Sequence, residues 1–190
     1  MSRPPEFDKS EALTSAMEAF RRQGYNGVSI KVLEQETGLS SGSLYNSFGS
    51  KDQLFARVVD HYNQIVVGGR IAGHIGAGSP AAGLMSMFVS LLDEPNGGSA
   101  GCLLTNTAVE FAGGHSAAVH GVSEGFDLLL AAFEQALAEI DRCRNPRVGA
   151  LKLLTFYQGL LVLIRHGYSK NELRRVIEDE ISSIIGEANV

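Results

Sequence analysis

The sequence has no tryptophan, and only two of its 190 residues are cysteines. Cys102 and Cys143 are too few for a disulfide framework, and neither lies in a metal-ligand spacing. No apolar run approaches the roughly 18 residues that are needed to cross a bilayer. The N-terminus, MSRPPEFDKSEAL, also lacks the apolar segment of a signal peptide. These absences predict a cytoplasmic protein with no membrane span, no metal and no other cofactor.

An excess of positive charge is missing as well. The chain has 16 lysines and arginines against 21 acidic residues, a net charge of −5. Such a balance argues against a protein that coats nucleic acid by bulk electrostatics. Residues 1–51 are electrically balanced, so the acidic excess lies beyond them. Any contact with DNA must therefore come from the local placement of a few groups.

Alternating apolar and polar residues of strand type are absent, whereas the 3.6-residue helical period recurs throughout. The sequence thus predicts an all-α protein with about nine helices. Serine or asparagine N-caps, glycine stops and Pro146 set most of the expected ends. The expected helices cover about 7–22, 29–37, 41–48, 51–68, 80–92, 102–111, 116–143, 146–166 and 171–185. A glycine-rich linker is expected over 66–80.

The segment SSGSLYNSFGSK, residues 40–51, places apolar anchors at helical spacing within a polar stretch. Leu44 and Phe48 are one helical turn apart and are expected to face inward. The opposite face would carry short hydrogen-bonding groups and one phenol, which suit the floor of a DNA major groove. That face consists of Ser41, Gly42, Ser43, Tyr45, Asn46 and Ser47.

Two short helices joined by TGLS predict a helix-turn-helix, in which the second helix reads the bases. Lys51 follows on the rim of the same surface, where a phosphate could bind. Ser29 and Lys31, at the start of the preceding helix, could contact the DNA backbone on the other side. The alternative is a solvated polar face on a small helical bundle.

Residues 16–62, AMEAFRRQGYNGVSIKVLEQETGLSSGSLYNSFGSKDQLFARVVDHY, resemble the DNA-binding domain of TetR/AcrR transcriptional regulators. The shared marks are A–F–GY, Ser29, TGLS, SLY, Phe48, SK and LF. The resemblance implies a homodimeric repressor that leaves a palindromic operator when a small-molecule effector binds its C-terminal domain. It also implies a DNA-binding domain over 1–50, a linking helix over 51–68, and a ligand-binding and dimerisation domain over 69–190.

Carried over by position, the resemblance assigns nine residues to the DNA interface. They are Ser29, Lys31, Ser41, Gly42, Ser43, Tyr45, Asn46, Ser47 and Lys51. Two positions depart from the family pattern. Glu34 replaces a small alanine, and Ser41 replaces a residue that is often basic or long and polar.

The C-terminal half contains GLLVLIRHG, which is apolar nearly all round and must be buried on more than one side. In the family, the last two long helices pair with their copies, which here means about 146–166 and 171–185. The alternative is a monomer with a central core helix. A mostly apolar pocket for a neutral, apolar or aromatic effector is expected inside the bundle. The candidate lining residues are Met85, Phe88, Cys102, Phe111, Phe126, Phe133, Phe156 and Tyr157.

Other functions remain open or are disfavoured. Cys102 lies near an expected helix N-terminus, a position that favours a reactive thiolate, so a redox or electrophile sensor is one alternative. Another is a helical ligand-binding protein whose helix-turn-helix is only structural. His115, His120 and Glu124 do not complete a metal-ligand set. The glycines of GGRIAGHIGAG follow a helix rather than a strand, and no catalytic arrangement is visible, so no enzyme is expected.

Overall fold

The computed structural model describes residues 7–76, 78–93, 98–112, 116–141, 143 and 145–186. Within these residues the regular secondary structure is entirely helical, which confirms the predicted all-α class. The helices are α1 (Lys9–Gly27), α2 (Ile30–Thr37), α3 (Ser41–Phe48), α4 (Lys51–Tyr62), α5 (Gly69–His74), α6 (Pro80–Val89), α7 (Leu103–Glu110), α8 (Val119–Ala138), α9 (Pro146–His166) and α10 (Lys170–Gly186). A π-helical segment (Asn63–Gly68) joins α4 to α5, and a 3-10 turn (Ser90–Asp93) follows α6. With the rod from α4 to α5 counted once, the described residues form nine α-helices, as predicted.

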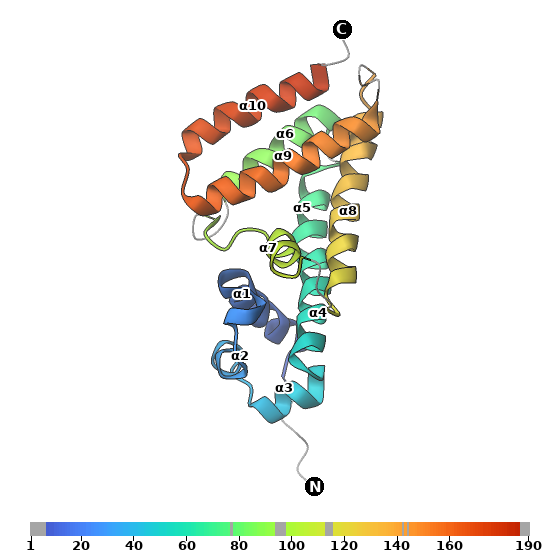
Figure 1. The fold of residues 1–190 in the computed structure, drawn as a ribbon. Helices are drawn as coiled ribbons and strands as arrows, with labels where there is room; N and C mark the ends of the chain where they lie inside the picture. The colour runs from blue at the N-terminus through green and yellow to red at the C-terminus, as the bar shows by residue number, and fades with distance from the viewer. Residues whose placement is uncertain are drawn as a thin grey trace.

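The helices form two lobes joined by one long rod (Figure 1). Helices α1, α2 and α3 pack together against α4 in the N-terminal lobe. The rod then continues through α5 alongside α8, while α6, α9 and α10 pack at its far end. Helix α7 lies between the lobes and contacts both α1 and α8. This arrangement places α2 and α3 at the end of the molecule away from α10.

The predicted N-caps are confirmed at three helices. The side chains of Ser29, Ser50 and Asn145 each accept a hydrogen bond from a backbone amide in the first turn of α2, α4 and α9. Ser50 and Gln53 form a complete capping box. Ser40, rather than Ser41, caps α3. Ser29 and Ser40 thus set where the two helices of the helix-turn-helix begin, and Ser50 sets where the following helix begins.

The first helix begins at Lys9 rather than at Phe7, because Asp8 caps it. The Asp8 Oδ1 atom accepts a 2.7 Å hydrogen bond from the second helical amide. Gly24 adopts φ 73° and ψ 170°, which interrupts the helical geometry where a stop was predicted. One further turn follows Gly24 before the extended residue Val28.

The glycine-rich linker predicted over 66–80 is wrong in its first part, because the chain stays helical as far as His74. Each glycine in a helix costs about 1 kcal/mol relative to alanine, but packing overrides that propensity here. Helix α6 lies against α5, and a Cβ on Gly83 would come within 2.6 Å of the His74 carbonyl oxygen. The glycine thus permits a backbone contact that holds α5 in place. The predicted domain division at residue 69 stays a prediction.

Two other helices are shorter than predicted. Helix α6 ends at Val89 and continues as a 3-10 turn, and α8 covers 119–138 instead of 116–143. Ser116 does not extend α8, because its hydroxyl donates to Asp52 in α4 at 2.7 Å. Parts of the predicted turn over 93–101, and the predicted break at 113–115, lie outside the described residues.

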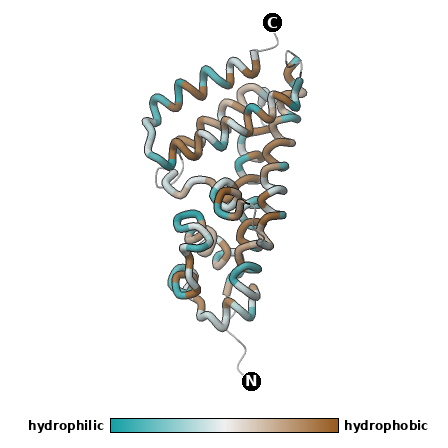
Figure 2. The backbone as a smooth tube through the Cα atoms, viewed as in Figure 1, coloured by the Kyte–Doolittle hydropathy of each residue, from teal (hydrophilic) through white to brown (hydrophobic). Residues whose placement is uncertain are grey.

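The core runs through both lobes and includes two aromatic clusters. Phe20 and Phe55 are almost fully buried in the N-terminal lobe, with ring centroids 4.7 Å apart. Phe88 and Phe133 are equally buried in the other lobe, with centroids 5.6 Å apart. In Figure 2 hydrophobic and hydrophilic positions alternate along α9 and α10, as expected for amphipathic helices. The buried side chains of both helices pack in this core.

Helix α9 contains a long apolar segment. Over an 18-residue window its mean hydropathy is 1.4, so length and composition alone would allow it to cross a membrane. One such helix is weak support for a span, because the core helices of globular proteins often have the same properties. Leu153, Leu160 and Ile164 of α9 are buried against the rest of the chain.

Gly125 in α8 marks a close contact with the π-helical segment. A Cβ there would meet the Asn63 Oδ1 atom at 2.4 Å and a Leu104 methyl carbon at 2.6 Å. We expect Gly125→Ala to lower the free energy of unfolding by about 1–3 kcal/mol through overpacking. Urea denaturation at fixed protein concentration measures this change. The control is Gly73→Ala, whose Cβ would meet nothing within 4 Å and which should not destabilise the protein. Equal destabilisation by both variants would contradict the assigned contact.

Candidate nucleic-acid interface

Helices α2 and α3 form a helix-turn-helix whose turn is fixed by glycine. Gly38 adopts the left-handed conformation, φ 70° and ψ 9°, and its amide donates to the Glu34 carbonyl oxygen. The caps of Ser29 and Ser40 then set where the two helices begin. Leu44 and Phe48 are buried, as predicted, and hold α3 against the core. The opposite face of α3 is left at the surface.

The nine residues assigned to DNA all lie outside the buried core. Tyr45 is 48% exposed, the most exposed aromatic position of the helix-turn-helix. The other exposed members of the set are Ser29, Lys31, Gly42 and Asn46. The half-buried members are Ser41, Ser43, Ser47 and Lys51. The result is a shallow polar surface on α3 with lysines at its borders, which can approach a groove closely.

Glu34, one of the two departures from the family pattern, caps α3 from the preceding helix. Its Oε1 atom accepts a 2.6 Å hydrogen bond from the Ser41 amide. Ser40 accepts from the Ser43 amide at 3.2 Å, so two of the first three amides of α3 have partners within the protein. A carboxylate at a helix N-terminus is favourable for the helix dipole. It also places a negative charge beside the surface assigned to DNA.

Lys51 is held at the rim by Tyr25. Its Nζ atom donates to the Tyr25 carbonyl oxygen at 2.7 Å and lies 4.2 Å from the centre of the Tyr25 ring. Partial burial lowers the pKa of Lys51, while the nearby Glu110 carboxylate acts in the opposite direction. An ammonium has three N–H donors, so this arrangement leaves capacity for a phosphate oxygen. Its DNA contact stays a prediction.

Two carboxylates that the sequence did not single out join the helix-turn-helix lobe to the other lobe. Glu110, at the end of α7, accepts hydrogen bonds from the Tyr25 amide at 2.8 Å and the Asn26 amide at 2.7 Å. Asp52 accepts from the Ser116 hydroxyl at 2.7 Å and the Ala117 amide at 3.1 Å. These contacts connect residues far apart in the sequence. The only sequence signal for Glu110 was a single acid at the end of an apolar segment.

The structure brings together only part of the predicted effector pocket. Phe88, Phe133, Phe156 and Tyr157 form one aromatic cluster, in which Phe88 touches each of the others. Phe111 lies elsewhere, 5.1 Å from the Tyr25 ring at the contact between the lobes. Met85 and Phe126, the remaining aromatic-pocket candidates, are half-buried against the core.

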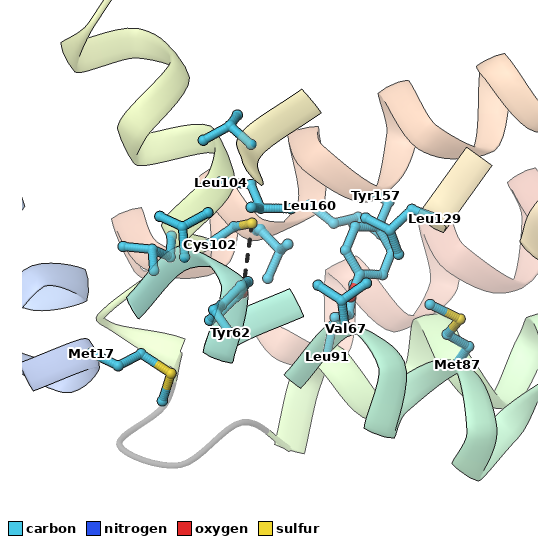
Figure 3. Close-up of a cluster of buried hydrophobic side chains, with 14 of the residues drawn as sticks. Met17, Tyr62, Val67, Met87, Leu91, Cys102, Leu104, Leu129, Tyr157 and Leu160 are labelled. Atoms are coloured by element: carbon cyan, nitrogen blue, oxygen red, sulfur yellow. Dashed lines mark hydrogen bonds between the residues drawn. The ribbon is translucent and has the colours of Figure 1, made fainter. Parts of the chain in front are cut away.

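The Cys102 thiol is buried between the lobes. The Tyr62 hydroxyl donates to its sulfur at 3.6 Å (Figure 3). Burial raises the pKa of Tyr62, so this phenol stays a hydrogen-bond donor at neutral pH. Tyr157 lies in the same buried region, next to Leu129 and Leu160 (Figure 3). The thiol-sensing alternative thus concerns a group with little direct access to solvent, and it stays a prediction.

The weak metal hypothesis gains no support from the described residues. The His120 Nε2 atom lies 3.1 Å from the Glu124 carboxylate on the exposed face of α8. Across the described ranges no group of three or more histidine, cysteine or carboxylate side chains could hold a metal ion. His115 lies outside those ranges.

Comparison with known proteins agrees with this geometry. Residues 12–58 match the pattern that defines "Bacterial regulatory proteins, tetR family". The helix-turn-helix region of this chain therefore carries the tetR-family pattern. A solved TetR-family transcriptional regulator from Streptomyces coelicolor has the same fold, with a TM-score of 0.83, 15% identity and coverage of 96% of each chain. A CifR cysteine mutant solved with 26-bp double-strand operator DNA has a TM-score of 0.80 and 24% identity over 95% of this chain and 99% of that one.

Sequence relatives match this chain over shorter stretches. The uncharacterised helix-turn-helix regulator YezE of Bacillus subtilis is 31% identical over 113 residues, which are 58% of each protein. The helix-turn-helix repressor ComR of Escherichia coli is 40% identical over 60 residues, 32% of this chain and 29% of ComR. The match therefore covers less than two thirds of these relatives' own length.

Removing the negative charge of Glu34 tests which surface meets DNA. We expect Glu34→Gln to keep an oxygen acceptor for the Ser41 amide while relieving repulsion from phosphates. Operator affinity should rise by about threefold to tenfold at low salt, and the gain should shrink as salt is added. The control is Glu178→Gln on α10, far from α3, which should leave affinity unchanged. Fluorescence anisotropy of labelled DNA gives both values, and equal effects would argue against this orientation.

Proposed function

We propose that this chain is a TetR-family, cytoplasmic transcriptional repressor that binds a palindromic operator as a homodimer. The observation that carries the proposal is the outer face of α3. Its side chains are small and polar, apart from the exposed Tyr45, and the buried Leu44 and Phe48 fix it against the lobe. Such a helix can enter the major groove and offer hydroxyl and amide groups to base edges. The likeness to CifR, which was solved with its operator, supports the same conclusion.

The charge distribution supports specific rather than bulk binding. Lys31 and Lys51 are the two lysines at the borders of the α3 surface, and the protein as a whole carries −5. A dimer would then neutralise about four phosphates, which predicts a slope of about −4 for log affinity against log salt. In addition, we propose that a small apolar or aromatic effector bound in the C-terminal lobe releases the operator.

Selection from a random double-stranded DNA library tests the DNA-binding part of the proposal. The full-length protein should enrich a sequence with two inverted half-sites, one helical turn or slightly more apart. The same fragment should bind with the salt slope given above. Failure to enrich any sequence, together with failure to bind its own upstream region, would favour the alternative of a helical protein whose helix-turn-helix is only structural.

The dimer proposal rests on an apolar stripe along α9. Val148, Leu151 and Val162 are 47%, 46% and 54% exposed, and they follow one another at helical spacing. Gly159 lies on the same stripe, and a Cβ there would meet nothing within 4 Å. Val176 of the neighbouring α10 is 49% exposed as well. Pairing this stripe with its copy would bury these side chains and allow close helix approach.

A charge placed in the stripe should separate the protomers. We expect Leu151→Asp to yield a monomer, because dimerisation would bury an unpaired carboxylate. Operator affinity should then fall by at least about a hundredfold, because a single α3 makes half the contacts. Analytical ultracentrifugation measures the mass, and anisotropy measures the affinity. Leu128→Asp, at an equally exposed site on α8, is the matched control and should stay dimeric. A dimeric Leu151→Asp protein would rule out this stripe as the interface.

A further inference from the structure

A cleft of about 420 Å³ lies where the two lobes meet, between the end of α1, α7 and the second half of α9. We call it the boundary cleft. Residues from both lobes line it, among them Arg22, Gly24, Cys102, Glu110, Leu161 and Arg165. Its volume falls within the range of small-molecule sites, which is about 300–1,000 Å³. It differs from the aromatic cluster around Phe88, none of whose members lines it.

Arg165 is exposed, but a hydrogen bond holds its guanidinium group at the edge of this cleft. Its Nη1 atom donates to the Asn106 Oδ1 atom at 2.7 Å. The Asn106 amide nitrogen donates in turn to the carbonyl oxygens of Ala100 at 3.1 Å and Arg21 at 3.3 Å. The stem of Arg165 also lies against Gly101, where a Cβ would come within 2.9 Å of its Cδ atom. The guanidinium is therefore pre-oriented, with most of its N–H donors still available.

The other charged groups of the cleft are already engaged. Both oxygens of Glu110 accept backbone hydrogen bonds from Tyr25 and Asn26. Arg22 pairs with Glu36 of α2 at 2.6 Å. Arg165 forms no ion pair with a carboxylate in the described part of the chain. The lining thus has two guanidinium groups against one carboxylate, in a protein whose net charge is negative.

The remainder of the lining is largely apolar. Leu161 is buried in the lining, and Cys102 and Val109 add apolar surface. A ligand that fits must therefore combine one negative group with an apolar body. Guanidinium groups bind carboxylates through two parallel hydrogen bonds, which gives such a ligand both affinity and orientation.

We propose that the boundary cleft binds an organic carboxylate, whose charged group pairs with Arg165 and whose apolar body lies on Leu161. Binding is coupled to the helix-turn-helix through two contacts at the edge of the cleft. The anion draws Arg22 away from Glu36, and it repels the Glu110 carboxylate that holds the turn after α1. Both effects disfavour the arrangement of α1 and α2 described above. This coupling, though not the site, rests on the proposed DNA-binding function.

Calorimetry on the full-length protein tests the site with defined probes. The probes are phenylacetate, indole-3-acetate and octanoate, each compared with its uncharged primary amide. At least one carboxylate should bind with a Kd below about 1 mM, and its amide should bind at least about tenfold more weakly. Equal affinity of acid and amide, or no binding by any of the three acids at about 10 mM, would overturn the proposal.

Two pairs of variants locate the bound anion. Arg165→Gln should weaken carboxylate binding by about tenfold or more, whereas Arg147→Gln, on the same helix but distant from the cleft, should not. Val109 is 74% exposed at the cleft, so Val109→Glu and Val109→Gln should fold alike. Only the added charge of Val109→Glu should then weaken binding. If Arg165→Gln and Arg147→Gln bind equally, or if both Val109 variants bind equally, the anion lies elsewhere.

Operator titrations with and without the bound carboxylate test the coupling. The carboxylate should weaken operator binding, and the operator should weaken carboxylate binding by the same factor. Carboxylate binding without any effect on DNA affinity would overturn the coupling and leave the site intact. A protein that binds the carboxylate but no DNA at all would instead contradict the proposed function.

Discussion

Replacement of Tyr45 and Asn46 together by alanine should weaken operator binding by about a thousandfold. The pair lies on the exposed face of α3, and both side chains occur twice in a dimer. At about 1 kcal/mol for each of four lost base contacts, the total is about 4 kcal/mol, and each 1.4 kcal/mol corresponds to a factor of ten. Neither side chain packs in the core, so the free energy of unfolding should change by less than about 0.5 kcal/mol.

Anisotropy titrations and urea denaturation measure the two quantities for the double variant. The matched control is Tyr168→Ala, because Tyr168 is 52% exposed and Tyr45 is 48% exposed. Tyr168 lies between α9 and α10, far along the chain from the helix-turn-helix. The control should bind the operator normally. A double variant with unchanged affinity would mean that another surface meets the DNA.

The largest expected loss of stability comes from Phe55→Ala. Phe55 is 1% exposed, and its ring lies between those of Phe20 at 4.7 Å and Tyr25 at 5.0 Å. It also touches Phe111 of the other lobe, with centroids 6.0 Å apart. Truncation of a buried phenylalanine costs about 3–5 kcal/mol, because apolar contacts are lost and a cavity remains. This loss could unfold a protein of ordinary stability at 37 °C.

Urea denaturation at 15 °C gives the difference from the unmodified protein. Protein concentration must be equal in both samples, because dimerisation adds to apparent stability. Leu128→Ala serves as the comparison, since Leu128 is 46% exposed and its truncation should change stability by less than about 0.5 kcal/mol. A loss below about 1 kcal/mol for Phe55→Ala would show that the ring is less tightly packed than described.

The helix-turn-helix could be predicted from the sequence because its determinants are local. The cap of Ser29, the left-handed Gly38 and the anchors Leu44 and Phe48 act within one or two helical turns. Ser29 begins α2, Gly38 ends it, and the two apolar side chains hold α3 against the core. Glu34 was noticed as unusual, but its hydrogen bond to the Ser41 amide depends on how α2 and α3 cross. The sequence shows that Glu34 departs from the family pattern, but it does not show that Glu34 caps α3.

The features that escaped prediction depend on distant contacts. Residues 69–74 stay helical despite their glycines because α6 packs against α5, with Gly83 close to the His74 carbonyl oxygen. The bonds from Glu110 to the amides of Tyr25 and Asn26 connect residues 85 and 84 positions apart. The boundary cleft needs three helices from different parts of the chain. Periodicity and capping rules contain no information about such pairings.

The hydrogen bonds that join the two lobes have a consequence for how the sequence can change. The Glu110 carboxylate accepts hydrogen bonds from two main-chain amides, and the Asp52 carboxylate accepts one from the amide of Ala117. Every amino acid except proline has a backbone N–H donor. The side chains of Tyr25, Asn26 and Ala117 can therefore change without loss of these hydrogen bonds. A helix-turn-helix with different surface side chains would keep these contacts, provided that it retained Asp52 and the backbone path of the turn after α1.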